Sequence, residues 1–165
     1  MVAFWLDGSA LTKRYVPENG SALVDFILDN VAEHRIYILN VGYAEVVSVL
    51  VRKKNAGTFS GARFSQALLD FESEVIQSLG KHLLSFDNSV VTDALSLIVK
   101  HSINSIDAIA LRIAMDVAQP LRSRGDDLIL VASDQRLLRA AGTEGLVTFD
   151  PETQDQAALA LLVGP

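Results

Sequence analysis

The chain has 165 residues, the size of one domain by the usual range of roughly 100–200 residues. Half of the residues are hydrophobic and 21% are charged, which excludes intrinsic disorder and supplies enough apolar surface for a core. The absence of Cys excludes disulfides, thiolate zinc sites and a cysteine nucleophile. A formal net charge of −6 argues against a broad basic DNA-coating surface, but not against a nucleic-acid enzyme with an acidic site.

No apolar run approaches the ~20 residues of a membrane span, and residues 1–7 lack the basic segment and long apolar stretch of a signal peptide. The three His residues (His34, His82 and His101) are too far apart to share a helix turn, which argues against a His-rich metal site. These features predict a cytoplasmic protein without a membrane partner.

Short apolar segments alternate with amphipathic segments along the chain. Strands are predicted over 2–6, 36–39, 82–86, 128–132 and 146–149. The predicted helices begin at Asn19 or Ser21, cover about 41–54 after a cap at Asn40, and then cover 60–79, 88–101, 105–117, 135–141 (ending at Gly142) and 157–163. Continuously apolar strands that alternate with helices are typical of a parallel sheet covered on both faces.

Two acidic residues follow predicted strands. Asp7 comes directly after the first strand, and Asp134 follows the apolar run 128–132. In open α/β sheets, ligands bind outside the carboxyl ends of the strands. Either Asp alone also fits a helix cap or an Asx-turn.

Two further acids lie on predicted helices. At ~100° per residue, Asp107 shares a face with Ala110 and Leu111, and a carboxylate on an apolar face is costly unless it is paired or binds a metal. A first-turn Asp also interacts favourably with the helix dipole. Glu45 lies on one stripe with Ser48 and Arg52, which alone fits a solvated helix face.

The four acids together suggest a metal site. Hard oxygen ligands from separate elements, without His or Cys, are what Mg²⁺ or Mn²⁺ prefers. Such ions support phosphoryl and phosphodiester transfer.

Four segments, in order, resemble the motifs of PIN-domain nucleases. They are Phe4-Trp5-Leu6-Asp7-Gly8-Ser9-Ala10-Leu11, Tyr43-Ala44-Glu45-Val46-Val47-Ser48, residues 105–114 around Asp107 and residues 131–141 around Asp134. The order and spacing agree over residues 2–151. In size and arrangement the chain is similar to the toxin component of VapBC-type toxin–antitoxin pairs.

This resemblance implies a three-layer α/β/α domain with a central, mainly parallel sheet over residues 1–151, and a tail or short helix of the same domain over 152–165. It implies a Mg²⁺- or Mn²⁺-dependent endoribonuclease, an RNA substrate, a cognate antitoxin and a homodimer. The implied catalytic and metal-binding residues are Asp7, Glu45, Asp107 and Asp134, with Ser9 supporting a ligand without binding the ion. Gly8 stands where the family often has a hydroxyl residue, and no further acid lies immediately around Asp134, which favours one stably bound ion before substrate arrives.

An acidic site needs nearby cations to hold a polyanion. Candidate RNA contacts are Lys13 and Arg14 after Asp7, Arg52 in the run 52–54, and Arg136 with Arg139 after Asp134. Each also fits an ordinary solvated surface charge. Trp5 and Tyr15 have rings that can stack on bases, although the position of Trp5 inside a strand favours the core.

Two other functions remain open from the sequence. One is a non-catalytic interaction module that keeps the PIN fold. The other is a metal-dependent phosphatase of the haloacid dehalogenase type, which normally has a second Asp two residues after its nucleophile, where Ser9 stands here.

Overall fold

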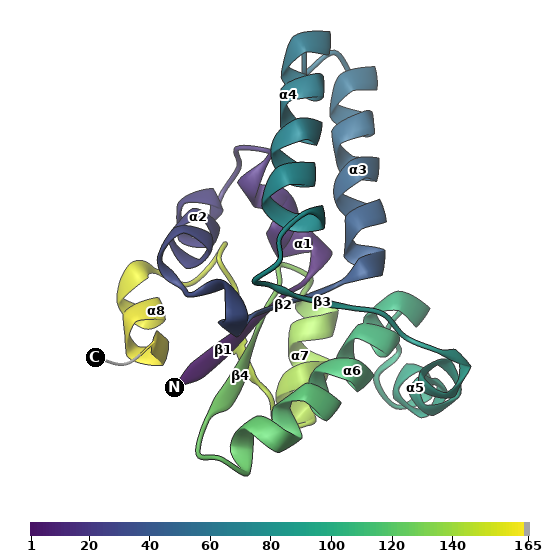
Figure 1. The fold of residues 1–165 in the computed structure, drawn as a ribbon. Coiled ribbons are helices and arrows are strands. Elements are labelled where there is room, and N and C mark those ends of the chain that lie inside the picture. Colours follow the sequence, from purple (N-terminus) through teal and green to yellow (C-terminus); the bar gives the residue numbers. More distant parts are fainter. Residues whose placement is uncertain (164–165) are drawn as a thin grey trace.

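The computed structural model describes residues 1–163, and within them a central sheet is flanked by helices (Figure 1). The strands are β1 (Val2–Leu6), β2 (Ile36–Leu39), β3 (His82–Leu84), β4 (Asp127–Val131) and β5 (Val147–Phe149). The helices are α1 (Gly8–Leu11), α2 (Ser21–Asn30), α3 (Asn40–Asn55), α4 (Gly61–Phe71), α5 (Asn88–His101), α6 (Ser105–Arg122), α7 (Gln135–Thr143) and α8 (Gln156–Val163).

The sheet order is β3-β2-β1-β4-β5, and every strand pairing in residues 1–163 is parallel. From β1 the chain winds outward through β2 to β3, and then returns past β1 to β4 and β5. The winding direction therefore reverses between β1 and β4, and open α/β sheets bind ligands at the carboxyl ends of strands beside such a reversal.

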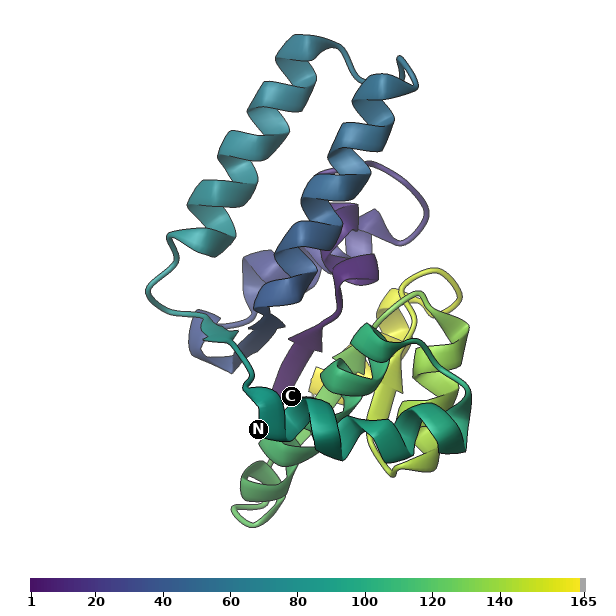
Figure 2. The same cartoon turned by 90° about the vertical axis from the view of Figure 1, so that its right-hand side faces the viewer.

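Helices cover both faces of the sheet (Figures 1 and 2). One buried apolar cluster joins α5, α6 and α7 to one face, and a second joins α1, α2, α3, α4 and α8 to the other. Both views show α3 and α4 as an antiparallel pair that projects beyond the sheet. The predicted three-layer α/β/α fold with a parallel sheet is confirmed.

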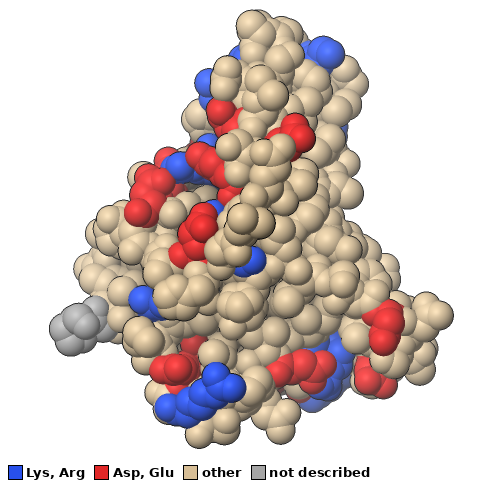
Figure 3. All heavy atoms as spheres, viewed as in Figure 1, with Lys and Arg blue, Asp and Glu red and all other residues tan. Residues whose placement is uncertain are grey.

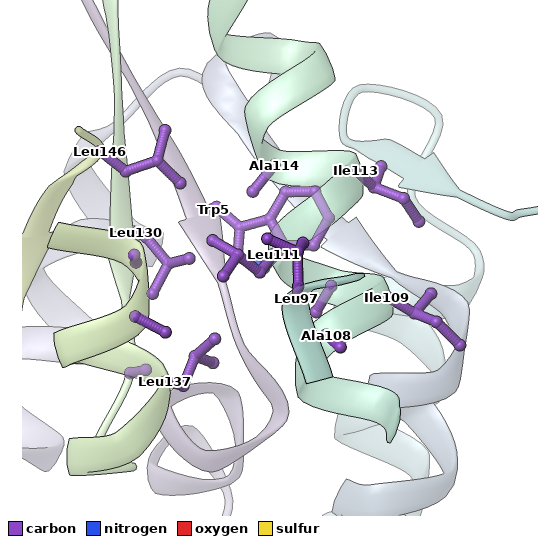
Figure 4. Close-up of a cluster of buried hydrophobic side chains, with 14 of the residues drawn as sticks. Trp5, Leu97, Ala108, Ile109, Leu111, Ile113, Ala114, Leu130, Leu137 and Leu146 are labelled. Atoms are coloured by element: carbon purple, nitrogen blue, oxygen red, sulfur yellow. The ribbon is translucent and has the colours of Figure 1, made fainter. Parts of the chain in front are cut away.

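The indole of Trp5 lies in the first of these clusters. It is fully buried between β4 side chains such as Leu130 and the α6 side chains Leu111 and Ala114 (Figure 4). Tyr15 is also buried, and its hydroxyl donates to Glu74. Neither ring is exposed for stacking on a base, so the interpretation of Trp5 as a core residue is confirmed.

Two predicted helix starts are wrong. α2 begins after Gly20, which has a φ of 86° and no capping side chain, rather than at a cap formed by Asn19 or Ser21. A Cβ at position 20 would lie 2.5 Å from the Pro151 carbonyl oxygen, so the close approach of two chain segments requires glycine there. Asn40 is itself the first residue of α3 and makes no capping hydrogen bond.

Three predicted helix ends also differ. The segment predicted as one helix over 60–79 is α4 followed by a π-helical turn at Glu72–Ile76. α6 continues beyond 117 through Pro120, because a proline in the last turn removes only one helical hydrogen bond there. α7 passes through Gly142, and the glycine in left-handed conformation after it is Gly145, with a φ of 82°.

The C-terminal segment forms α8, whose Leu159 is buried in the second apolar cluster. Its division from the rest of the domain at residue 151 stays a prediction, and residues 164–165 lie outside the described part. No single helix within residues 1–163 is long and apolar enough to cross a bilayer. Only α5 and α6 together reach that length and composition, with a bend of 111° between them.

Candidate active site

The four predicted acids line one cleft of about 460 Å³ at the carboxyl ends of β1 and β4. Asp7 follows β1 and Asp134 follows β4, so the two come from the strands between which the winding direction reverses. Glu45 reaches the cleft from α3, and Asp107 reaches it from the first turn of α6. The fold therefore brings together side chains that are up to 127 residues apart in the sequence.

Asp7 and Asp134 are each held by the N-terminus of the helix that follows them. One oxygen of Asp7, Oδ2, accepts from the Ser9 backbone N–H at 3.0 Å and from the Ser9 hydroxyl at 2.6 Å. Asp134 Oδ1 accepts from the N–H groups of Arg136 at 2.7 Å and Leu137 at 3.2 Å. The capping role that each Asp fits on its own is thus real, and it fixes the direction of the carboxylate.

Asp107 is held by Asn104, the N-cap of α6. Asn104 Oδ1 accepts from the Asp107 N–H, and Asn104 Nδ2 donates to Asp107 Oδ2, both at 2.8 Å. Asp107 is only 8% exposed, which confirms its predicted inward face on α6. Asn104 was not among the predicted site residues, although Asn directly before a predicted helix is a signal for an N-cap.

These hydrogen bonds leave one oxygen of each Asp free. Within residues 1–163, Asp7 Oδ1, Asp107 Oδ1 and Asp134 Oδ2 have no hydrogen-bond donor, and neither carboxylate oxygen of Glu45 has one. Each Asp therefore has one anchored oxygen and one oxygen available to a ligand in the cleft.

The absence of a side chain at Gly8 leaves the space that the Glu45 carboxylate occupies. A Cβ at position 8 would lie 1.9 Å from Glu45 Oε2 and 3.0 Å from Glu45 Cβ. A larger residue there would force the Glu45 carboxylate to move. The departure from the family pattern at Gly8 thus has a local explanation in the close approach of α3 to α1.

Burial and mutual repulsion raise the pKa values of three of these acids. Burial, together with the charges of Asp7 and Asp107, raises the pKa of Glu45 to about 7. Burial, together with Asp7 and Asp134, raises the pKa of Asp107 to about 6, although Asn104 and Arg136 oppose this rise. Burial also raises the pKa of Asp7, against its hydrogen bonds from Ser9. Carboxylates that destabilise one another in this way are stabilised by a bound cation.

Ser9 joins the two central strand ends. Its hydroxyl donates to Asp7 and accepts from the Ser133 N–H at 3.0 Å, in the turn after β4. Ser9 thus fixes the Asp7 carboxylate and ties it to the turn after β4, which suits a role in supporting a metal ligand.

The donor set fits an oxygen-preferring divalent ion. Carboxylate side chains from four separate parts of the fold line one cleft, and Mg²⁺ and Mn²⁺ bind through a few such groups while keeping waters. Within residues 1–163, no three acidic or His side chains are already gathered closely enough to form a complete metal site. Binding an ion would therefore require the side chains to close on it, and Glu45, on a flexible stem, has the greatest reach.

Lys13 and Arg14, predicted as possible RNA contacts, are engaged in ion pairs. Lys13 is buried, and its Nζ donates to Glu18 at 2.9 Å and to Glu152 at 2.6 Å. The Arg14 guanidinium contacts carboxylates of three residues within 3.1 Å. These residues are Asp25, Asp29 and Glu74. Both cations therefore join elements of the fold.

Arg52 and Arg136 differ from Lys13 and Arg14 in that no carboxylate in residues 1–163 neutralises them. Arg52 lines the acidic cleft from α3, and the positive charge of Arg136 acts on Asp107 from α7. Within residues 1–163, neither has a carboxylate partner. On the face viewed in Figure 1, basic side chains are scattered among acidic ones rather than gathered into a broad basic surface (Figure 3).

Fold and site together define the class: an α/β/α protein with an acidic, oxygen-donor cleft at the point where its parallel sheet reverses direction. The family model for the PIN domain matches residues 5–143, which include all four acids. The chain belongs to the PIN domain family, and the predicted resemblance is confirmed. No curated protein sequence matches the chain.

Solved structures share this fold at low sequence identity. PAE2754 from Pyrobaculum aerophilum is 20% identical, with a TM-score of 0.62 over 98% of this chain and 93% of that one. Mycobacterium tuberculosis VapC20, a sarcin-ricin loop cleaving toxin, is 13% identical, with a TM-score of 0.61 over 93% and 100%. A toxin–antitoxin complex from Klebsiella pneumoniae is 15% identical, with a TM-score of 0.55 over 90% and 98%.

Proposed function

We propose that this protein is a Mg²⁺- or Mn²⁺-dependent endoribonuclease and the toxin of a toxin–antitoxin pair. The observation that carries the proposal is the cleft in which Asp7, Glu45, Asp107 and Asp134 converge with free carboxylate oxygens. Membership of the PIN domain family supports nuclease chemistry. The fold shared with VapC20 and with a toxin–antitoxin complex supports RNA as substrate and an antitoxin as partner.

The four acids would hold the ion, which when bound activates water for attack on phosphorus and stabilises charge on the phosphate oxygens. Asp7 and Asp134 cap helices with one oxygen, and Asp107 accepts from the cap residue Asn104 with one oxygen. Each would bind the ion with its other oxygen, so the helix N-termini fix the directions of the ligands. Ser9 would hold Asp7 in place. Arg52 and Arg136 would contact phosphates on either side of the cleft.

A cytoplasmic location and a homodimer stay predictions. A non-catalytic module with this fold remains the alternative. The free carboxylate oxygens argue against it, because four neighbouring carboxylates without a bound cation only destabilise the fold. Family membership argues against the phosphatase.

The test is cleavage of a pool of structured RNAs by the purified protein in Mg²⁺ or Mn²⁺, then in excess EDTA, beside Asp107→Asn. We expect products that need the metal and that disappear in the variant. Asp116→Asn, on the exposed face of the same helix, is the matched control and should cleave normally. Absence of cleavage together with absence of a metal-induced thermal shift would instead indicate the non-catalytic module.

A second prediction separates the cations. Lys13→Met keeps the buried apolar stem but removes two ion pairs, so we expect the free energy of unfolding to fall by about 1–2 kcal/mol. The affinity of the Lys13→Met protein for RNA should be unchanged.

Arg52→Gln should weaken RNA binding without changing the free energy of unfolding, because the Arg52 guanidinium has no carboxylate partner in residues 1–163. Denaturant titration and RNA-binding isotherms check both variants. If Lys13→Met is as stable as the wild type but binds RNA more weakly, Lys13 contacts RNA and the prediction is wrong.

A further inference from the structure

A second polar cavity is lined by two segments that also contribute to the acidic cleft, namely the connection between α5 and α6 and the start of α7. It has a volume of about 410 Å³ and is formed where the end of α5 meets α7. Its lining includes His101, Ser102, Arg136, Arg139 and Thr143. None of these residues is among the four acids, and the cavity is referred to below as the α5–α7 pocket. We propose that the α5–α7 pocket binds a backbone phosphate of the RNA next to the one that is cleaved, an inference that rests on the proposed function.

The positive charge of the pocket comes from two arginines on one face of α7. Arg136 and Arg139 are three residues apart, so they lie about one helical turn from each other and their side chains are neighbours. Both are exposed, and within residues 1–163 neither guanidinium has a carboxylate partner. By contrast, Arg14, Arg112 and Arg122 all form ion pairs. The two pocket arginines are therefore available for an external anion.

One acid beside the pocket, Glu144, is already paired with two basic side chains. The Glu144 carboxylate accepts from Lys100 Nζ at 2.7 Å and from His101 Nε2 at 2.5 Å. These contacts lower the pKa of Glu144, so it stays ionised and paired. The pocket therefore keeps an excess of positive charge although Glu144 lies at its border.

The pocket also has the right position relative to the cleft. Asp134 caps α7, and Arg136 and Arg139 follow it in the first two turns of that helix. The charge of Arg136 already acts on Asp107, which lines the cleft. Arg52 lines the cleft from α3. A strand that crosses the four acids from Arg52 would thus meet the α5–α7 pocket next.

The chemistry of the pocket favours a phosphate. Paired guanidinium groups bind phosphate oxygens through two parallel hydrogen bonds, and the Ser102 hydroxyl in the lining adds a further possible donor. A backbone phosphate carries no base information, so the pocket would fix the path of the strand rather than its sequence. An acidic protein segment is the competing occupant, and the experiment separates it from RNA.

Arg139→Gln is the main test variant, because Arg136 also acts on Asp107. Binding of a fluorescent single-stranded oligoribonucleotide is measured in EDTA over a range of salt concentrations, and cleavage kinetics are measured in Mn²⁺. Arg124→Gln removes the same charge before the amino end of β4, at the opposite end of the strands from the cleft, and is the matched control. An oligoglutamate peptide is titrated in parallel.

We expect Arg139→Gln to weaken RNA binding about tenfold, independent of base sequence. The slope of log affinity against log salt should fall by about 0.7, the value for one lost phosphate contact on a single strand. In cleavage, KM should rise while kcat stays near that of the wild type, because the contact is made before and during reaction alike. Arg124→Gln should match the wild type in all three.

Other outcomes distinguish failure of the pocket from failure of the proposed function. If the wild type cleaves RNA and Arg139→Gln is indistinguishable from it, the pocket is not a phosphate site and the proposed function stands. If RNA binding depends on Arg139 but the wild type never cleaves, the pocket stands and the proposed nuclease fails. If the wild type neither binds nor cleaves RNA, both fail. Oligoglutamate that binds more tightly than RNA, and through Arg139, would assign the pocket to an acidic protein segment.

Discussion

Replacement of Asp7 by Asn is expected to abolish metal-dependent RNA cleavage, with a loss of at least about 10²–10³-fold in kcat. Asp7 lies at the end of β1, at the centre of the sheet, and it lines the cleft with one carboxylate oxygen that no donor occupies. An amide oxygen is a far weaker ligand for a divalent ion than a carboxylate. The variant should therefore bind metal poorly while keeping the local fold.

The fold should survive because Asn is as good an N-cap as Asp. Its side-chain oxygen can accept the two hydrogen bonds that Ser9 now donates to Asp7. Circular dichroism and denaturant titration check that the free energy of unfolding is not lowered. Cleavage at the wild-type rate by a folded Asp7→Asn protein would show that the proposed site is wrong.

The second large effect is a gain in stability. Glu45→Gln is expected to raise the free energy of unfolding of the metal-free protein at pH 8 by about 1–2 kcal/mol, after allowance for partial exposure of the side chain. The pKa of Glu45 is about 7 in the folded protein, against an ordinary value of 4.5. Its charge therefore costs folding free energy, and Gln removes that cost.

The pH dependence follows from the same difference. Below about pH 4.5 the group is protonated in both folded and unfolded states, so it costs nothing. Between about pH 4.5 and 7 the unfolded state loses its proton first, and stability falls as pH rises. The advantage of Glu45→Gln should thus appear across this interval and be complete at pH 8. Urea titrations in EDTA at pH 5 and pH 8 measure it.

A bound ion should cancel this cost in the wild type. Mn²⁺ should raise the melting temperature strongly at pH 8 and little at pH 5, where protons compete for the same oxygens. Glu45→Gln should lose most of the shift. Equal metal-induced shifts in both proteins would mean that Glu45 is not a ligand.

Much of the fold could be predicted because its three central strands, β2, β1 and β4, are short, almost continuously apolar and mostly buried. The first two strands were predicted with their observed bounds, β1 (Val2–Leu6) and β2 (Ile36–Leu39). The inward position of Asp107 followed from helical periodicity alone. These features depend on the spacing of apolar residues over neighbouring positions, which can be read directly from the sequence.

What the sequence analysis missed depends on contacts between distant segments. α2 begins after Gly20, where the close approach of Pro151 requires glycine, and no local signal identifies that neighbour. Lys13 looks like a surface cation until Glu18 and Glu152 are placed beside it. Glu45 looks like part of a solvated helix face until α3 packs against α1 at Gly8. The order of the strands, which puts Asp7 beside Asp134, is likewise a tertiary property.

The central claim is that the four acids form one divalent-metal site. Anomalous X-ray diffraction from a crystal soaked in Mn²⁺ tests it most directly. The account predicts a peak in the cleft, about 2 Å from carboxylate oxygens of at least two of the four acids, and loss of that peak in Asp7→Asn. A cleft without a peak at Mn²⁺ concentrations that support RNA cleavage, or a peak bound only by other residues, would contradict it.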